Sequence, residues 1–110
     1  MATAYKVLGQ SNPAATTSTA LYTVPAATEA VISTIVICNQ AAADATYRLC
    51  VKPDGAALAA KHYLAYDVTV GASDSTTLTL GITLDATDVL EVYASTATVS
   101  FNAFGSEITA

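Results

Sequence analysis

Side chains that could do catalytic chemistry are few and scattered in this 110-residue sequence. His62 is the single histidine, and it stands beside Tyr63 without a nucleophile or carboxylate at a spacing that would pair with it. Serine and threonine are abundant, but no GxSxG sequence surrounds any serine, so both are interpreted as sheet residues rather than nucleophiles. The sequence therefore predicts a protein that is not an enzyme and uses no cofactor.

Metal and disulfide chemistry are predicted to be absent as well. Cys38, Cys50 and His62 offer soft ligands, but their spacing matches no zinc motif and supplies no fourth ligand. Neither cysteine lies in a CxxC, and both are expected as free thiols, with Cys38 in a central strand and Cys50 on an outward, polar face. Carboxylates at turns commonly accept backbone hydrogen bonds, which is how we interpret the turn aspartates Asp74, Asp85 and Asp88.

Composition and charge exclude several classes of protein. Hydrophobic residues make up 53% of the chain and charged residues 12%, which excludes intrinsic disorder. The net charge of -5 and the lack of any basic run argue against binding nucleic acid or an anionic membrane. The apolar run 31–38 is too short for a spanning helix, and the first residues contain no apolar stretch typical of a secretory signal. We expect a protein made inside the cell.

The pattern of residues predicts an all-β fold. Short stretches rich in Thr, Val, Ile and Tyr alternate apolar and polar side chains, and Gly, Pro and Asp interrupt them about every ten residues. This is typical of an antiparallel two-sheet β-sandwich, jelly-roll-like, with eight or nine short strands. We expect one domain over residues 1–110, with a short strand and an extended arm in 1–19 and the sandwich core in 20–110. Residues 56–61 are expected to form a loop that contains at most a single helical turn.

Individual stretches allow predictions about the direction of side chains. Residues 29–39 are expected to form a central strand covered on both faces, because their apolar side chains fall on both sides. Period-2 alternation predicts core-facing side chains in three stretches: Tyr47, Leu49 and Val51; Leu78 and Leu80; Leu90, Val92 and Ala94. Val99 and Phe101 are also expected in the core, Gly81 at a bulge or bend, and Ile108 in a final short strand.

The N-terminal part of the chain points to assembly with other proteins. The 22 positions between Lys6 and Glu29 contain no charged side chain, and Pro13 keeps its surroundings extended. An extended arm offers unpaired backbone groups that can pair with the edge of a neighbouring sheet. Uncharged surfaces with tyrosines suit contacts between subunits. We therefore expect a homo-oligomer.

Several segments together resemble a known family. They are residues 5–10 (YKVLGQ), 13–17 (PAATT), 21–26 (LYTVPA), 30–39 (AVISTIVICN), 46–48 (TYR), 80–84 (LGITL) and 88–94 (DVLEVYA). These segments look like those of small virion structural proteins of tailed bacteriophages, cyanophages among them. The Leu-Tyr-x-Val-Pro segment is the more specific part, whereas the final pattern is shared by many β-sandwiches.

The resemblance implies a non-enzymatic β-sandwich attached to a phage particle. A capsid decoration or cement protein that stabilises the major capsid lattice is the function expected first, and a tail, collar or baseplate fibre-attachment protein is the alternative. A carbohydrate- or receptor-binding module is a third reading, served by Tyr22, Tyr63, Tyr66 and Tyr93. The expected partner is the major capsid protein. Among homo-oligomers, a trimer is favoured over a dimer. The protein is expected in the virion, after synthesis in the host cytoplasm. Candidate interface residues are Tyr5, Lys6, Leu8, Asn12, Pro13, Tyr22 and Pro25.

Overall fold

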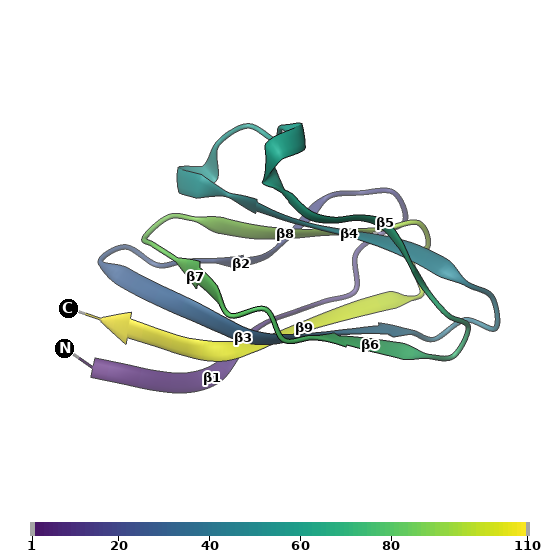
Figure 1. The fold of residues 1–110 in the computed structure, drawn as a ribbon, viewed down its shortest axis with the longest axis horizontal. Helices are drawn as coiled ribbons and strands as arrows, with labels where there is room; N and C mark the ends of the chain where they lie inside the picture. The colour runs from purple at the N-terminus through teal and green to yellow at the C-terminus, as the bar shows by residue number, and fades with distance from the viewer. Residues whose placement is uncertain (1, 110) are drawn as a thin grey trace.

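Nine strands occupy most of residues 2–109, the part of the chain that the computed structural model describes (Figure 1). They are β1 (Ala2–Ser11), β2 (Thr19–Thr23), β3 (Thr28–Asn39), β4 (Ala45–Lys52), β5 (Tyr63–Val70), β6 (Ser75–Leu78), β7 (Ile82–Leu84), β8 (Val89–Ala94) and β9 (Val99–Thr109). Two 3-10 turns, η1 (Pro53–Gly55) and η2 (Ala60–His62), interrupt the connection from β4 to β5.

The strands form two antiparallel sheets that face each other. One has the order β1-β9-β3-β6, with β7 also pairing with β3, and the other has the order β2-β8-β4-β5. Figure 1 shows the two sheets as layers, with the η1–η2 segment standing on the outside of the four-stranded sheet. The prediction of an all-β, two-sheet antiparallel sandwich is confirmed.

Alternation along the strands fills the space between the sheets. Tyr47 and Leu49 of β4, Leu90 of β8 and Phe101 of β9 are almost fully buried, as the period-2 patterns predicted. The rings of Tyr47 and Phe101 meet edge to face with their centroids 6.4 Å apart, which joins the two sheets at the centre of the core. Most of the remaining core is aliphatic or alanine.

The N-terminal segment differs from the prediction. A short strand and a long extended arm were expected in residues 1–19, but β1 runs over ten residues and pairs with β9 from Ala2↔Thr109 to Ser11↔Phe101. The final short strand expected around Ile108 is likewise part of one strand that continues from Val99 through Gly105. Both predictions underestimated strand length because a strand can continue through glycine and small polar residues when a neighbour supplies its hydrogen bonds.

Three expectations about side-chain exposure differ from the structure. Only one face of β3 is fully buried, since Val31, Val36 and Cys38 on its other face keep partial exposure. Leu80 is exposed, because β6 ends at Leu78 and the chain turns at Gly81, whose φ is 64°. Cys50 does lie on the outward face of its sheet, opposite Glu91, but it is buried. The segment 56–61 agrees with the prediction of a loop that contains at most one turn, because residues 56–59 are irregular and the single 3-10 turn η2 begins at Ala60 and contacts β4.

Candidate functional site

The outer edge of β1 is the least protected edge of the sandwich. Proteins guard their edge strands by keeping them short, bulged or charged, because unpaired backbone groups would otherwise pair with another chain. The other edge strands within residues 2–109 are protected in this way. β2 has five residues and a register shift, β6 and β7 are short and separated at Gly81, and β5 contains a bulge at Asp67, whose φ is 50°. In β1 the register with β9 shifts between Val7 and Gly9, but the stretch from Ala2 to Val7 pairs regularly. Within residues 2–109, the side of β1 that faces away from β9 pairs with no other strand, so it can accept a strand of another chain.

Two large hydrophobic side chains of β1 are exposed. Tyr5 is 86% exposed and Val7 is 49% exposed, whereas Lys6 between them points to the opposite face of the sheet, where it pairs with Glu107 and stays about half exposed. Tyr5 and Val7 therefore share the outer face of the sheet. A tyrosine this exposed contributes little to the stability of the single chain, and it is well placed to contact a second one.

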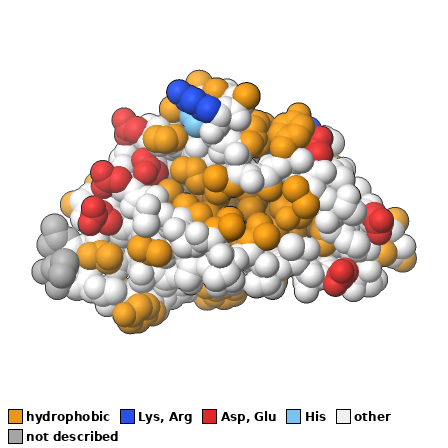
Figure 2. All heavy atoms as spheres, viewed as in Figure 1, with side chains coloured by type: hydrophobic (Ala, Val, Ile, Leu, Met, Phe, Trp, Pro, Cys, Tyr) orange, Lys and Arg blue, Asp and Glu red, His pale blue; other side chains and the backbone are white. Residues whose placement is uncertain are grey.

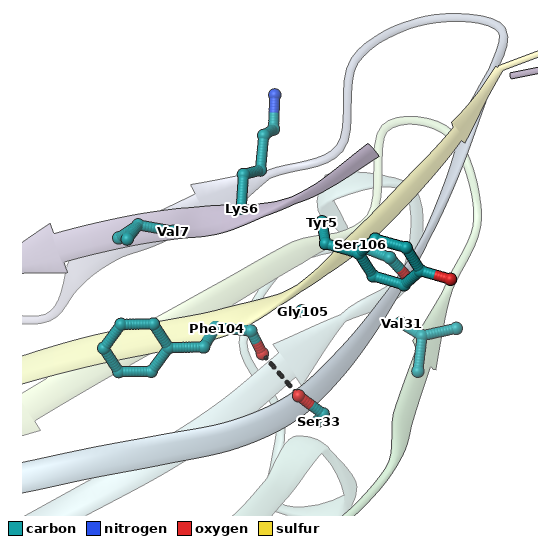
Figure 3. A pocket seen from close by; sticks show the side chains of 8 residues that line it. All are labelled: Tyr5, Lys6, Val7, Val31, Ser33, Phe104, Gly105 and Ser106. Carbon is teal, nitrogen blue, oxygen red and sulfur yellow. Dashed lines mark hydrogen bonds between the residues drawn. The ribbon is translucent and has the colours of Figure 1, made fainter. Parts of the chain in front are cut away.

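A shallow apolar groove lies beside these side chains on the outer face of the sheet. Figure 3 shows Tyr5, Val31 and Phe104 around the backbone at Gly105. The groove has a volume of about 490 Å³ and crosses β1, β9 and β3. A Cβ atom on Gly105 would lie 2.0 Å from the carbonyl oxygen of Val31, so only glycine permits this approach of β9 to β3.

A register irregularity of β3 sits at the same place. The pairing of β3 with β9 shifts between Ile32 and Thr34, and the intervening Ser33 donates a hydrogen bond from Oγ to the carbonyl oxygen of Phe104 at 3.1 Å. Bulges of this kind increase the local twist of a strand, and Figure 3 shows Ser33 and Phe104 at the groove.

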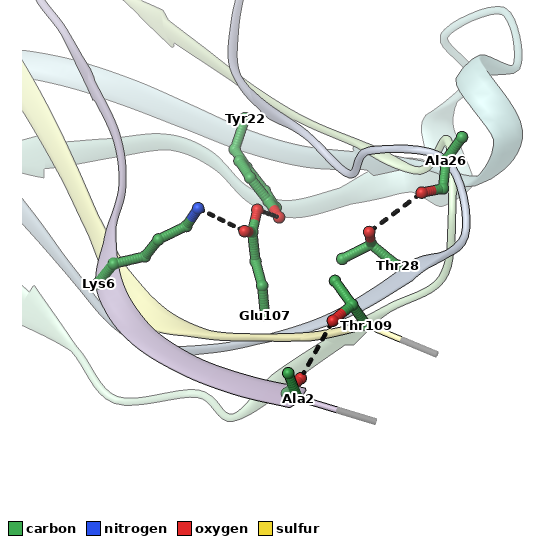
Figure 4. Close-up of polar contacts among 7 residues, drawn as sticks. All are labelled: Ala2, Lys6, Tyr22, Ala26, Thr28, Glu107 and Thr109. Carbon is green, nitrogen blue, oxygen red and sulfur yellow. Dashed lines mark hydrogen bonds and ion pairs between the residues drawn. The ribbon is translucent and has the colours of Figure 1, made fainter.

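A polar cluster fixes β1 to the rest of the sandwich from the inside. The Glu107 carboxylate accepts a hydrogen bond from the Tyr22 hydroxyl at 2.5 Å and forms an ion pair with the Lys6 ammonium (Figure 4). Lys6 lies on β1, Glu107 on β9 and Tyr22 on β2, so the cluster joins both sheets. Glu107 and Tyr22 are 9% and 8% exposed. A buried carboxylate is stable here because both oxygens have partners.

The cluster shifts the ionisation of both buried groups. Its hydrogen bonds to Lys6 and then to Tyr22 hold the pKa of Glu107 below its ordinary value, against the effect of burial. Burial, followed by the hydrogen bond to Glu107, raises the pKa of Tyr22 well above its ordinary value. The ion pair also means that an approaching strand meets no uncompensated charge from Lys6 on β1.

The structure brings some of the candidate interface residues together and separates others. Tyr5, Lys6 and Tyr22 lie around β1, although Tyr22 is buried in the cluster. The other candidates lie elsewhere. Leu8 packs against the core and Pro13 is buried, whereas Pro25 is exposed after β2. Asn12 donates hydrogen bonds to the carbonyl oxygens of Ala97 and Val99.

Sequence reasoning missed Glu107, Val7, Phe104 and Gly105 as parts of this surface. The one available signal was Glu107, an acidic residue inside an otherwise uncharged strand.

His62 and the turn aspartates each accept hydrogen bonds from the backbone. His62 is buried and accepts a hydrogen bond at Nδ1 from the backbone N–H of Ala59 at 3.0 Å. The turn aspartates accept backbone hydrogen bonds, as predicted, from Ser75 to Asp74, from Ala86 to Asp85, and from Asp54 and Asp85 to Asp88. Residues 2–109 contain no group of three metal-ligating side chains and no helix long and apolar enough to cross a membrane.

The surface in Figure 2 carries few charges. Acidic side chains lie toward the two ends of the visible face, and hydrophobic side chains gather in its middle. Large apolar side chains exposed elsewhere on the described chain, besides those of β1, are Leu58, Leu64, Tyr66, Val68 and Leu80. A surface of this kind is suited to contacts with other proteins.

A β-sandwich that is poor in charged residues and has an open edge strand is the class of protein that these features define. No family model and no curated protein matches the sequence. A solved structure of a pentameric capsid protein isolated from metagenomic phage sequences is similar to it over 94% of this chain and 60% of that protein, with 16% identity and a TM-score of 0.37. The chain spans about three fifths of the length of that protein.

Proposed function

We propose that this chain is a non-enzymatic structural protein of a phage virion, a decoration or cement protein that binds the major capsid lattice. The observation that carries the proposal is the open edge of β1, regular from Ala2 to Val7, with Tyr5 86% exposed on it. A strand of the partner adds to this edge through backbone hydrogen bonds, and Tyr5 and Val7 contact its side chains. The resemblance of the sequence to small virion proteins supports the choice of partner.

A capsid lattice suits a weak but repeated contact of this kind. Each copy offers one edge strand and one shallow groove, which bury a modest area. When linked copies contact the lattice at several equivalent positions, the contacts reinforce one another and the whole layer becomes hard to remove. The protein then resists deformation of the shell without any chemistry of its own.

We further propose that copies of the chain associate with each other, as a trimer in preference to a dimer. Exposed apolar side chains and the low content of charged residues, 12%, favour burial of surface between copies. Preference for the trimer follows the family resemblance. Sedimentation at micromolar concentration measures the mass directly, and a single species of 11.2 kDa would contradict self-association in solution.

The decisive experiment adds purified protein to capsids stripped of their native copy. We compare the wild type with Tyr5→Lys, which places a charge on the open edge, and with Leu80→Lys, which places the same charge on a side chain 51% exposed elsewhere. Copies per particle and survival on heating are measured. Tyr5→Lys should lower both, while Leu80→Lys should behave as the wild type.

Two outcomes overturn the proposal. Equal occupancy for Tyr5→Lys and the wild type means that β1 is not the attachment edge. Binding of the wild type to tails but not to shells, in a handful of copies per particle, assigns the protein to the tail, collar or baseplate instead.

A further inference from the structure

Three tyrosines gather on the outer face of the four-stranded sheet, on the other side of the molecule from the β1 groove. Tyr63 and Tyr66 come from β5 and Tyr93 from β8, and Arg48 of β4 lies between Tyr66 and Tyr93. The Arg48 Cζ atom is 4.1 Å from the ring centroid of Tyr66 and 4.3 Å from that of Tyr93. Tyr22 was considered together with these tyrosines as a possible sugar contact, but it is buried, donates its hydroxyl to Glu107 and does not belong to the cluster.

Two of the rings form the corner of a pocket. The rings of Tyr63 and Tyr66 are perpendicular, with an interplanar angle of 90° and centroids 4.9 Å apart. Both line a pocket of about 550 Å³ whose other wall comes from the segment before β5, Leu58, Ala59 and Ala60. Tyr66 is 56% exposed and Leu58 is 40% exposed, so the pocket is open to a ligand from solution.

The polar groups beside this corner are fixed in position. The Arg48 guanidinium donates two hydrogen bonds to the Asp67 carboxylate, at 2.6 Å from Nε and 3.3 Å from Nη2. Stacking between two rings and pairing with Asp67 leave the guanidinium little freedom. The remaining N–H groups and carboxylate lone pairs can bond to a ligand without costly ordering.

Charge restricts the class of ligand. Arg48 is paired with Asp67, and Lys52 is paired with Glu91 on the same face. An anionic ligand would need an unpaired cation and a basic ligand an unpaired carboxylate, and neither of these two pairs offers one. Lys61, the other cation of this region, lines a separate pocket with Val51 and Leu64 and is not part of the tyrosine corner. A neutral molecule with an apolar face and many hydroxyl groups matches both the aromatic corner and the polar groups beside it.

We propose that this corner, formed by Tyr63, Tyr66 and the Leu58–Ala60 wall, is a binding site for a neutral carbohydrate. The C–H face of a pyranose ring packs against the tyrosine rings, and its hydroxyl groups bond to Asp67 and Arg48. The site belongs to the sheet that does not contain β1, so the carbohydrate site and the open edge of β1 that we propose binds the capsid act independently. One chain can thus hold the particle with one sheet and a glycan with the other.

The test uses the full chain and an array of neutral oligosaccharides of glucose, galactose, mannose and N-acetylglucosamine. An oligosaccharide that binds is then titrated while amide shifts are followed by NMR. We expect shifts concentrated around Leu58–Ala60 and Tyr66. Tyr66→Ala should weaken binding at least about tenfold, since it removes the packed ring. Tyr66→Phe keeps the ring and should bind within a few-fold of the wild type.

Tyr5→Ala is the matched control, because it removes an even more exposed tyrosine from the other sheet. It should leave carbohydrate binding unchanged. The proposal is overturned if no neutral oligosaccharide binds, if only sulfated or sialylated glycans bind, or if Tyr66→Ala binds as the wild type does. The proposal is also overturned if the wild type binds no glycan and Tyr66→Ala lowers capsid occupancy, because this face would then be a contact with another protein.

Discussion

The hydroxyl of Tyr22 donates a hydrogen bond to the carboxylate of Glu107 across the interior of the sandwich, 2.5 Å from Oη to Oε2 and 85 positions apart in the sequence. Tyr22 belongs to one sheet and Glu107 to the other. The second carboxylate oxygen pairs with Lys6 on β1. The buried Glu107 side chain therefore links the open edge strand β1 to β2 of the other sheet. We expect the stability of that edge to depend on the negative charge of Glu107.

We expect Glu107 to make the protein sensitive to acid. Since its pKa is lower in the folded chain than in the unfolded one, its contribution is complete above about pH 4.3 and is lost as the pH falls through the folded value. Glu107→Gln should cost about 2 kcal/mol of unfolding free energy at pH 7 and less at pH 3. Urea unfolding at both pH values measures this, and an equal difference at both would contradict it.

Tyr22→Phe isolates the hydrogen bond from the packing of the ring. The phenyl ring fills the same space, but the buried carboxylate keeps only Lys6 as a partner. We expect a loss of about 1.5 kcal/mol, because a hydrogen bond to a charged group is lost. Tyr5→Phe changes an exposed ring and should leave the melting temperature unchanged. Similar melting temperatures for the two variants would show that the Tyr22 hydroxyl is not important.

The two glycines at special positions should differ in their tolerance of alanine. Gly105→Ala places Cβ 2.0 Å from a backbone oxygen that cannot move independently of β3, and we expect a loss of about 3 kcal/mol or more. Gly81→Ala meets only an unfavourable φ of 64°, with open space around Cβ, and should cost about 1 kcal/mol. Thermal unfolding gives the order, and the reverse order would mean that β9 and β3 are less close than described.

The two thiols should remain reduced and react at different rates. Cys38 lies on the outer face of β3 and Cys50 on the outer face of β4, in different sheets, so the sandwich separates them. Burial raises the pKa of Cys50, which slows alkylation further. Without reductant, the native protein should gain one adduct quickly at Cys38, and the protein in urea should gain two. No adduct in urea would indicate a disulfide.

The sequence by itself determined the fold class and the direction of many core side chains. Alternation in β4 and β8 identified Tyr47, Leu49, Leu90 and Val92 as core residues, and the structure confirms them. Successive side chains of a strand point to opposite faces, so this information is local and needs no knowledge of the neighbouring strand. The aspartates of the turns were identified for the same reason, because their backbone partners are mostly close in the chain.

Only the tertiary structure decided which edge is open and what each polar side chain contacts. β1 became a sheet strand because β9, about a hundred residues later, supplies its hydrogen bonds. Cys50 is buried although its position in the alternation is outward, and Tyr66, Arg48 and Tyr93 form one cluster from three strands. Strand order and the packing of distant segments depend on the total free energy of the folded chain, which no short stretch of residues contains.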